Sequence, residues 1–252
     1  MTAAQKHAVL ITGGAHGIGA ACVRLFAAEG YPVLFCGRDE TAGAALAADT
    51  QGARYFPADL GSAEGVARAA EQALEMSGGI LSGLVNNAGY GFRGVFEETT
   101  DEIYDRVMEL NLRAPIMLTA RLMGALKAGR GSVVMISSVA GKGGEEGLAL
   151  YTASKAALIG LTKSLALEVG RCAAFDRVIR HIAVLVGHVY VVVDVGVRPL
   201  QLGDLSGKGL SGVGIKPDRR RIVELESQSL FVGDPEADHP ALVIAGHDKC
   251  GL

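Results

Sequence analysis

Neither sign of charge is in large excess in this sequence of 252 residues. It has 27 acidic residues against 24 lysines and arginines, which gives a net charge of −3. This balance gives no electrostatic basis for binding nucleic acid or an anionic membrane. It still allows a phosphate-bearing ligand, because backbone amides and one or two arginines can bind such a group locally.

Paired cysteines and long apolar runs are also lacking. The cysteines show no CxxC pair, which argues against a zinc site or a disulfide framework and favours reduced thiols in a cytoplasmic protein. The most apolar segment, residues 182–193, is interrupted by Gly187 and His188 and is shorter than the roughly 20 residues that span a bilayer. The first ten residues carry Lys6 and His7 before the first apolar run, so no signal peptide is expected there. The cysteines are Cys22, Cys36, Cys172 and Cys250, and the histidines without metal-ligand spacing are His181, His188, His239 and His247.

Short apolar runs alternate with helical patterns over the first 170 residues. This alternation predicts right-handed βαβ crossovers, and therefore an α/β fold with a doubly wound parallel sheet and helices on both faces. Thr99 and Glu102 have the spacing of a capping box that opens a helix to about residue 112, and Pro115 stands near the start of the next helix. Strands are expected at residues 8–12, 33–36, 54–57, 81–86 and 132–137. The other helices are expected to end near residue 29 and to cover residues 39–48, 62–76, 115–127 and 150–169.

The first strand is followed by the glycine-rich segment TGGAHGIG, residues 12–19. Glycines let a backbone approach a pyrophosphate closely, and the free amides and the dipole at a helix N-terminus favour its negative charge. The spacing GxxxGxG resembles the TGxxxGIG cofactor loop of the short-chain dehydrogenase/reductase family. The segment NNAG, residues 86–89, resembles the next motif of that family, which supports the sheet beside the cofactor. The resemblance implies cofactor contacts from Gly13, Ala15, His16, Gly17, Ile18, Gly19, Asn87, Ala88 and Gly89.

Tyr151 and Lys155 lie four residues apart on an expected helix, so their side chains share one face. A free phenol has a pKa of about 10, and a nearby cation moves it toward the working range of a proton donor. Ser138 follows the fifth strand with the offset from Tyr151 that the family shows, and Asn111 resembles its fourth catalytic member.

The resemblance implies a role for each of these four residues, and it covers residues 8–170. Tyr151 protonates the carbonyl oxygen as hydride arrives from the nicotinamide, and Ser138 hydrogen-bonds the same oxygen. Lys155 binds the nicotinamide ribose and lowers the pKa of Tyr151, and Asn111 keeps a water in the relay behind Lys155. The whole chain, residues 1–252, is then expected to be a single Rossmann-type domain of about seven strands, with residues 1–170 as the cofactor-binding and catalytic part and 171–252 as an atypical C-terminal segment.

Residues at the end of the second strand determine which of the two nicotinamide cofactors, NAD or NADP, is preferred. An acid there accepts hydrogen bonds from the ribose 2′-hydroxyl, whereas an arginine pairs with a 2′-phosphate. Gly37 stands where relatives that prefer NAD carry the acid, and Arg38 follows it, so NADPH is expected rather than NADH. The alternative is that Arg38 is a solvated surface residue. Asp59 and Leu60 match family positions beside the adenine, although Asp59 also suits a helix cap.

After about residue 170 the family pattern ends. Two β-branched runs, residues 180–187 and 189–195, are nearly adjacent, and residues 241–245 suit a final strand. No Pro-Gly pair follows the first run, residues 203–214 are rich in glycine, and Arg219–Arg221 is a basic cluster that suits a solvated helix start. The segment is a divergent tail, an alternative reading frame or a replacement with another role. The abrupt loss of motifs favours the second.

The function expected from these observations is reduction of a ketone by NADPH. Among relatives, the sequence resembles 3-oxoacyl-[acyl-carrier-protein] reductases and related ketoreductases. A sugar, alcohol or steroid dehydrogenase is the alternative within the family, and a nucleotide-binding protein without turnover is the alternative outside enzymes. By analogy the chain forms a homodimer or homotetramer through residues 108–127 and 150–169. The expected partner is a small carbonyl compound, not a nucleic acid or a membrane.

Overall fold

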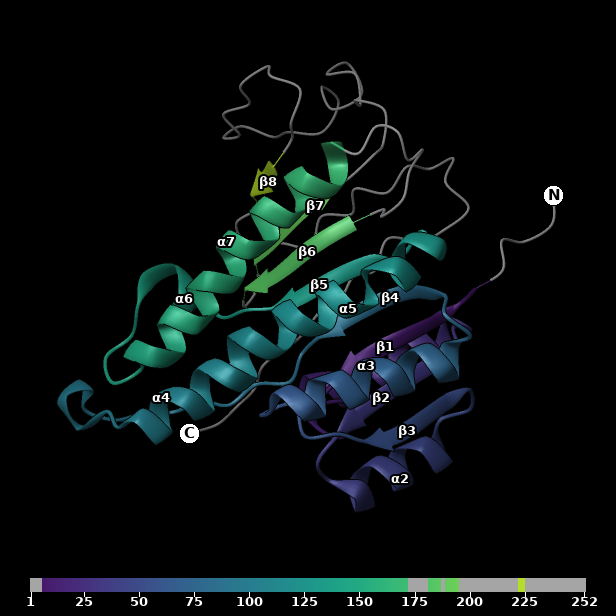
Figure 1. Cartoon of the computed structure of the whole chain (residues 1–252), viewed down its shortest axis with the longest axis horizontal. Helices are drawn as coiled ribbons and strands as arrows, with labels where there is room; N and C mark the ends of the chain where they lie inside the picture. Colours follow the sequence, from purple (N-terminus) through teal and green to yellow (C-terminus); the bar gives the residue numbers. More distant parts are fainter. Residues whose placement is uncertain (1–5, 172–180, 187–188, 195–221, 225–252) are drawn as a thin grey trace.

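The structure, a computed structural model, describes residues 6–171, 181–186, 189–194 and 222–224. The strands in these ranges are β1 (Ala8–Thr12), β2 (Val33–Gly37), β3 (Ala53–Pro57), β4 (Leu81–Asn86), β5 (Ser132–Ile136), β6 (His181–Val186), β7 (Val189–Asp194) and β8 (Ile222–Glu224). They form one eight-stranded sheet in the order β3-β2-β1-β4-β5-β6-β7-β8 (Figure 1). Neighbours from β3 to β6 are parallel, whereas β7 is antiparallel to β6 and β8 is antiparallel to β7.

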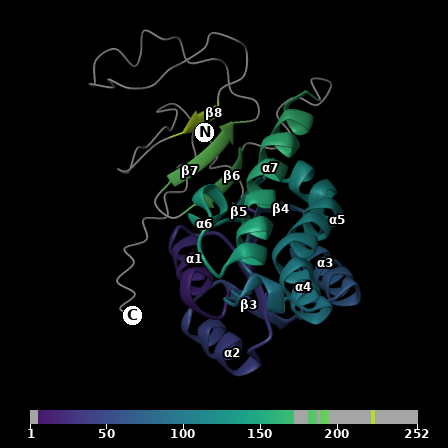
Figure 2. The same ribbon diagram turned by 90° about the vertical axis from the view of Figure 1, so that its left-hand side faces the viewer.

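Helices cover both faces of this sheet, as Figure 2 shows. They are α1 (Gly17–Ala28), α2 (Glu40–Asp49), α3 (Ala63–Ser77), α4 (Asp101–Met108), α5 (Ala114–Ala128), α6 (Ala140–Gly143) and α7 (Ala149–Arg171). One hydrophobic cluster joins the sheet to α3, α5 and α7, and a second joins it to α1 and α2. The doubly wound α/β fold predicted from the sequence is therefore confirmed.

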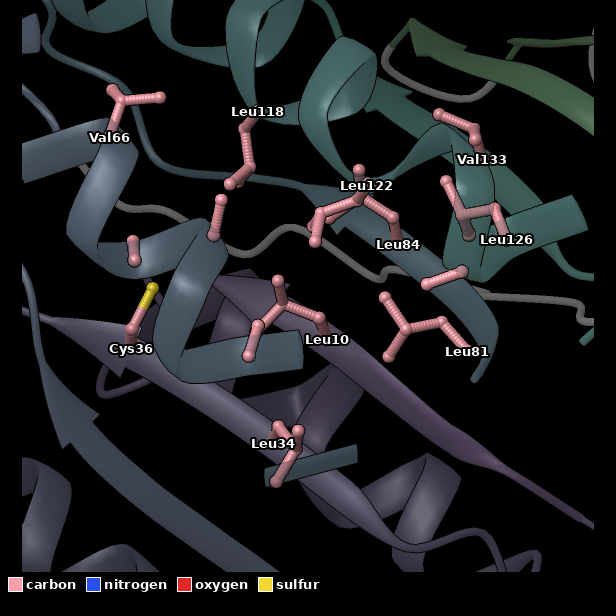
Figure 3. Packing of buried hydrophobic residues seen from close by; sticks show 14 of the residues in the cluster. Leu10, Leu34, Cys36, Val66, Leu81, Leu84, Leu118, Leu122, Leu126 and Val133 are labelled. Atoms are coloured by element: carbon pink, nitrogen blue, oxygen red, sulfur yellow. The ribbon is translucent and has the colours of Figure 1, made fainter. Parts of the chain in front are cut away.

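Alternate side chains of β1 enter the two clusters, because successive residues of a strand point to opposite faces. Leu10 packs with Leu118 and Leu122 of α5 in the cluster drawn in Figure 3. Val9 and Ile11 belong to the cluster on the other face. All five side chains are at most 1% exposed, and each burial stabilises the fold by about 1.5–3 kcal/mol.

The order of the strands places a crevice at the carboxyl ends of β1 and β4. The chain passes from β1 to β2 on one side, while β4 lies on the other side of β1. Ligands of open parallel sheets bind where the strand order reverses in this way. Thr12 and Asn86, the last residues of the two strands, therefore mark the position of the expected site.

Two local predictions are corrected by the structure. The helix α4 is capped by Thr100, whose Oγ1 accepts from Ile103 N at 3.3 Å, and not by Thr99. Thr99 is already used by the preceding 3₁₀ turn, since its N–H donates to Phe96 O. The break expected near residue 112 is instead a π-helical turn, Glu109–Arg113, that joins α4 directly to α5.

The two β-branched runs beyond residue 180 do form strands. β6 pairs in parallel with β5, and β7 pairs with β6 in the antiparallel direction, with Leu185 opposite Tyr190. The predicted strand at 241–245, the segment 203–214 and the cluster Arg219–Arg221 lie outside the described residues, as do His188, His239 and His247. Among the helices that the structure describes, none combines the length and apolar character needed to cross a membrane.

Candidate active site

The glycine turn between β1 and α1 is shaped by two close backbone approaches. A Cβ at Gly19 would lie 2.1 Å from Gly13 O, and one at Gly13, where φ is +62°, would lie 2.9 Å from Ala88 Cα. A Cβ added at Gly17, where φ is +50°, would instead meet no atom within 4 Å. His16 is the N-cap residue of α1 and makes no side-chain cap bond. The turn is thus packed from below and open above the first-turn amides of α1, which suits an anionic group.

Hydrogen bonds fasten this turn to the NNAG segment. Thr12 Oγ1 accepts from Asn87 N and from Ala88 N, each at 3.0 Å. Asn87 Nδ2 donates to Thr12 O at 2.9 Å and to Gly13 O at 3.1 Å. The carboxyl ends of β1 and β4 are therefore held together as one unit. Thr12 was part of the sequence motif but was not assigned a role, and this contact supplies one.

Asn86 and Asn111 bind protein groups with their side chains. Asn86 Nδ2 donates to Thr119 Oγ1 at 3.0 Å and so ties β4 to α5. Asn111, in the π-helical turn, accepts from Tyr90 N at 2.7 Å and donates to Tyr90 O at 2.9 Å and to Ser154 Oγ at 3.1 Å. Its amide therefore holds the loop after β4 against α7. The predicted role of Asn111 in retaining a water stays a prediction.

Tyr151 and Lys155 come together on the first turns of α7, as the spacing predicted. Lys155 is 4% exposed, and its Nζ lies 5.6 Å from the centroid of the Tyr151 ring. Lys155 Nζ donates to Ile136 O, the last residue of β5, at 2.8 Å. Burial lowers the pKa of Lys155 to about 8, because a low-dielectric surrounding disfavours the ammonium.

Ser138 follows β5 and is half-buried beside α7. Its Oγ accepts from Ala140 N at 3.2 Å, which leaves the hydroxyl proton for another acceptor. The turn after it packs tightly on the helix, since a Cβ at Gly141 would lie 3.1 Å from Lys155 Cβ. Ser137, which the sequence did not single out, donates from Oγ to Lys155 O at 2.7 Å. Ile136, at the end of β5, and Ser137, which follows it, therefore hold α7 at the position of Lys155.

The NNAG segment passes close to this group. A Cβ at Gly89 would lie 3.4 Å from Lys155 Nζ and 3.3 Å from Asn111 Oδ1. The segment thus connects the glycine turn, through Asn87, to Lys155. The glycine turn and the predicted catalytic residues accordingly lie together at the carboxyl ends of β1, β4 and β5.

The loop after β4 forms one wall of this crevice and is bound to the segment before α7. The Arg93 guanidinium pairs with Glu145, and Arg93 Nη1 donates to Glu146 O at 2.8 Å. Gly94 N donates to Gly147 O at 2.9 Å. Because its charge is already paired, Arg93 adds no free cation for an acidic substrate or carrier.

A cavity of about 340 Å³ lies beyond the ends of β2 and β3 and is lined by Gly37, Arg38 and Asp59 among others. Arg38 makes no ion pair with any residue that the structure describes. Asp39 turns to α2 and to the glycine turn: its Oδ1 accepts from Ala42 N at 2.9 Å and its Oδ2 lies 2.8 Å from His16 Nε2. The amide of Ala42 and the His16 ring lower the pKa of Asp39.

Asp59, Leu60 and Ile18, which are also predicted to contact the cofactor, differ in their exposure and in their contacts. Asp59 Oδ1 accepts from Gly61 N at 3.0 Å, while the cap of α3 is Ser62, so the capping alternative for Asp59 finds no support here. Leu60 is 5% exposed and packs into the core, whereas Ile18 is 48% exposed beside the glycine turn.

Comparison with known proteins agrees with this arrangement. The family model of the short chain dehydrogenases matches residues 7–195. The L-fucose dehydrogenase of Mus musculus is 35% identical over 164 residues, which cover 65% of this chain and 60% of the relative. The solved structure of a putative betaketoacyl-ACP reductase is 37% identical with a TM-score of 0.61, and covers 65% of this chain and 67% of that one. A variant of the actinorhodin polyketide ketoreductase, solved with NADPH, is 32% identical with a TM-score of 0.62, and covers 66% of each chain.

The chain spans about 60% of the length of such curated relatives. The family match takes in the glycine turn, the NNAG segment, Ser138, Tyr151 and Lys155. The resemblance drawn from the sequence motifs is therefore confirmed, and this chain belongs to the short chain dehydrogenase family.

Proposed function

We propose that the protein is an NADPH-dependent carbonyl reductase in which Tyr151 gives the proton to the substrate oxygen. The observation that carries the proposal is the pairing of Tyr151 with the buried Lys155 on α7, which the end of β5 holds through hydrogen bonds of Lys155 with Ile136 and Ser137. A phenol next to a buried ammonium is a proton donor whose conjugate base is stabilised when the proton leaves. Reduction of a carbonyl needs such a donor, because negative charge develops on the oxygen.

The residues of the crevice fit a nicotinamide dinucleotide. Gly17 leaves the space above the α1 amides open for the pyrophosphate, and Gly89 leaves room beside Lys155. When bound, a reduced nicotinamide supplies the hydride. The protein's own part is then to hold the carbonyl oxygen with the Ser138 hydroxyl, to protonate it from Tyr151, and to keep the ammonium of Lys155 next to the phenolate that remains.

NADPH is proposed over NADH because of the charges beyond β2. Gly37 provides no carboxylate at the strand end, and Arg38 lines the cavity there without an ion-pair partner among the described residues. Asp39, the acid that follows Arg38 in the sequence, is held by Ala42 and His16. Solved relatives carry either cofactor, NADPH in the actinorhodin ketoreductase and NADH in a 3-ketoacyl-(acyl-carrier-protein) reductase from Brucella melitensis, so the proposal rests on the charges of this site.

The test is Tyr151→Phe against the parent, with the exposed Tyr104 of α4 changed to Phe as the matched control. Loss of a general acid lowers kcat by about 10²–10⁴-fold, while the dissociation constant for NADPH should stay within about twofold. Tyr104→Phe should leave both quantities unchanged. A Tyr151→Phe enzyme that reduces ketones at the parental rate would contradict the proposed role.

Two other functions can be distinguished from this proposal by assaying the protein with ketones, 3-oxoacyl thioesters, sugars and steroids. Oxidation of a sugar fits the L-fucose dehydrogenase relative and predicts turnover with an aldose and NADP⁺ or NAD⁺ but slow reduction of ketones. A nucleotide-binding protein without turnover predicts a thermal midpoint that rises with NADPH but no reaction with any carbonyl compound, sugar or steroid. Faster reduction of 3-oxoacyl thioesters than of simple ketones would identify the substrate class that the betaketoacyl-ACP reductase relative suggests.

A further inference from the structure

A second arginine lines the cavity beyond β2 and β3. Arg68 of α3 shares this lining with Arg38, which follows the end of β2. Gly65, Arg68 and Ala69 all face the cavity, and their spacing of three and four residues places them on one side of the helix. Arg68 is the charged side chain that this side of α3 presents to the cavity.

The first turn of α3 is held in a fixed place relative to the sheet. A Cβ at Gly65 would lie 1.7 Å from Asp59 O, so the helix backbone touches the segment that follows β3. Ser62 Oγ caps the same turn by accepting from Gly65 N at 3.0 Å. Arg68, one turn further along, therefore starts from a rigid position over the cavity.

Small residues form much of the cavity wall, and charged ones stand at its edge. Gly37, Ala58 and Ala69 contribute little or no side chain, so a flat ring can lie against them. Arg38 and Arg68 are both exposed, and neither has an ion-pair or hydrogen-bond partner in the part of the chain that the structure describes.

Two acidic side chains balance the charge of these two arginines. Glu40 and Asp59 line the same cavity, and Asp59 also accepts from Gly61 N. The charge of the cavity is therefore balanced overall, and its two guanidinium groups are free to bind a ligand. Guanidinium groups bind phosphate oxygens through paired, charge-assisted hydrogen bonds.

We propose that Arg68 is a second specificity residue, which binds the ribose 2′-phosphate of the nucleotide together with Arg38. The proposal rests on the function proposed above, in that the cavity holds the adenosine end of the cofactor. A phosphate bound in this cavity then meets one guanidinium that follows β2 and one from α3. Arg38 alone, next to Glu40, would give a weaker preference for the phosphorylated nucleotide.

The experiment measures binding without turnover, by calorimetry with adenosine 2′,5′-bisphosphate and with adenosine 5′-phosphate. The dissociation constant for adenosine 5′-phosphate, divided by that for adenosine 2′,5′-bisphosphate, measures how much the 2′-phosphate strengthens binding. Arg68→Gln should lower this ratio about tenfold, as for the loss of one charge-assisted contact at an exposed site, and Arg38→Gln should do the same. The control is Arg24→Gln, which removes the same charge from the exposed face of α1 and should leave the ratio unchanged.

Each other outcome has a separate meaning. A parental ratio in Arg68→Gln together with a lowered ratio in Arg38→Gln overturns the role of Arg68 and leaves the proposed NADPH preference intact. Equal weakening of both nucleotides by Arg68→Gln means that Arg68 contacts the adenine or the ribose, and it also overturns the proposal. A parent chain that binds the two nucleotides equally well refutes the NADPH preference itself.

Discussion

Replacing Thr12 by valine should lower the free energy of unfolding far more than the small change in side-chain shape suggests. The side chain is 2% exposed, and its Oγ1 accepts from two backbone N–H groups, Asn87 N and Ala88 N, at 3.0 Å each. Valine keeps the shape but removes the acceptor, so both donors lose their partner. An unsatisfied buried donor costs about 1–3 kcal/mol. Because Asn87 and Ala88 are only half-buried, the expected total is about 2–3 kcal/mol.

A matched control exists in α7. Thr162 is fully buried, and its hydroxyl donates to Leu158 O at 2.8 Å, but that carbonyl already accepts the helical bond. Thr162→Val therefore leaves no group without a partner and should cost about 1 kcal/mol or less.

Urea unfolding followed by circular dichroism gives both values. With a slope of about 1–3 kcal/mol per molar urea, Thr12→Val should lower the midpoint by roughly 1 M and Thr162→Val by much less. Thr12→Ser restores the acceptor and should recover most of the loss. Equal midpoints for Thr12→Val and Thr162→Val, or a Thr12→Ser variant as unstable as Thr12→Val, would refute the reasoning.

Three further predictions concern the site and the start of α4. Turnover should fall as pH rises through about 8, where Lys155 loses its charge. The free energy of unfolding should instead rise between pH 8 and about 10.4, the pKa of lysine in the unfolded chain, because the unfolded chain binds more protons there. Urea unfolding measured over the same pH range therefore distinguishes loss of activity from loss of stability. Gly89→Ala puts a Cβ 3.4 Å from Lys155 Nζ and should lower kcat about tenfold with little change in the thermal midpoint. Thr100→Ala should cost about 1 kcal/mol in urea unfolding, whereas Thr99→Ala should cost much less; the reverse order would restore the cap that the sequence suggested.

The residues that the sequence predicted best are those whose spacing alone fixes their geometry. Tyr151 and Lys155 share a face on any helix, because four residues make about one turn. The glycines at 13, 17 and 19 follow a strand and precede a helix, and only a few turn shapes satisfy that order. The apolar runs that became β1, β2 and β4 were equally direct, since nearly all of their residues are buried.

Other features depend on contacts that a sequence does not display. The direction of β7 was open, because a β-branched run has the same pattern in parallel and antiparallel pairs. Thr99 and Thr100 both precede two acids, and only the 3₁₀ turn that uses Thr99 N decides between them. Arg68 looks like a solvated helix residue until α3 is placed against the end of β3.

Lys155 brings together the two demands on this site, because it has to be charged and yet buried. Its ammonium meets one carbonyl, Ile136 O, and one aromatic ring, Tyr151, and burial lowers its pKa to about 8. The backbone of Lys155 is in turn bonded to Ser137, so the end of β5 holds the residue at both its main chain and its side chain. The groups that hold Lys155 in place, which are Ile136, Ser137 and Tyr151, all lie in the part of the chain that precedes residue 171.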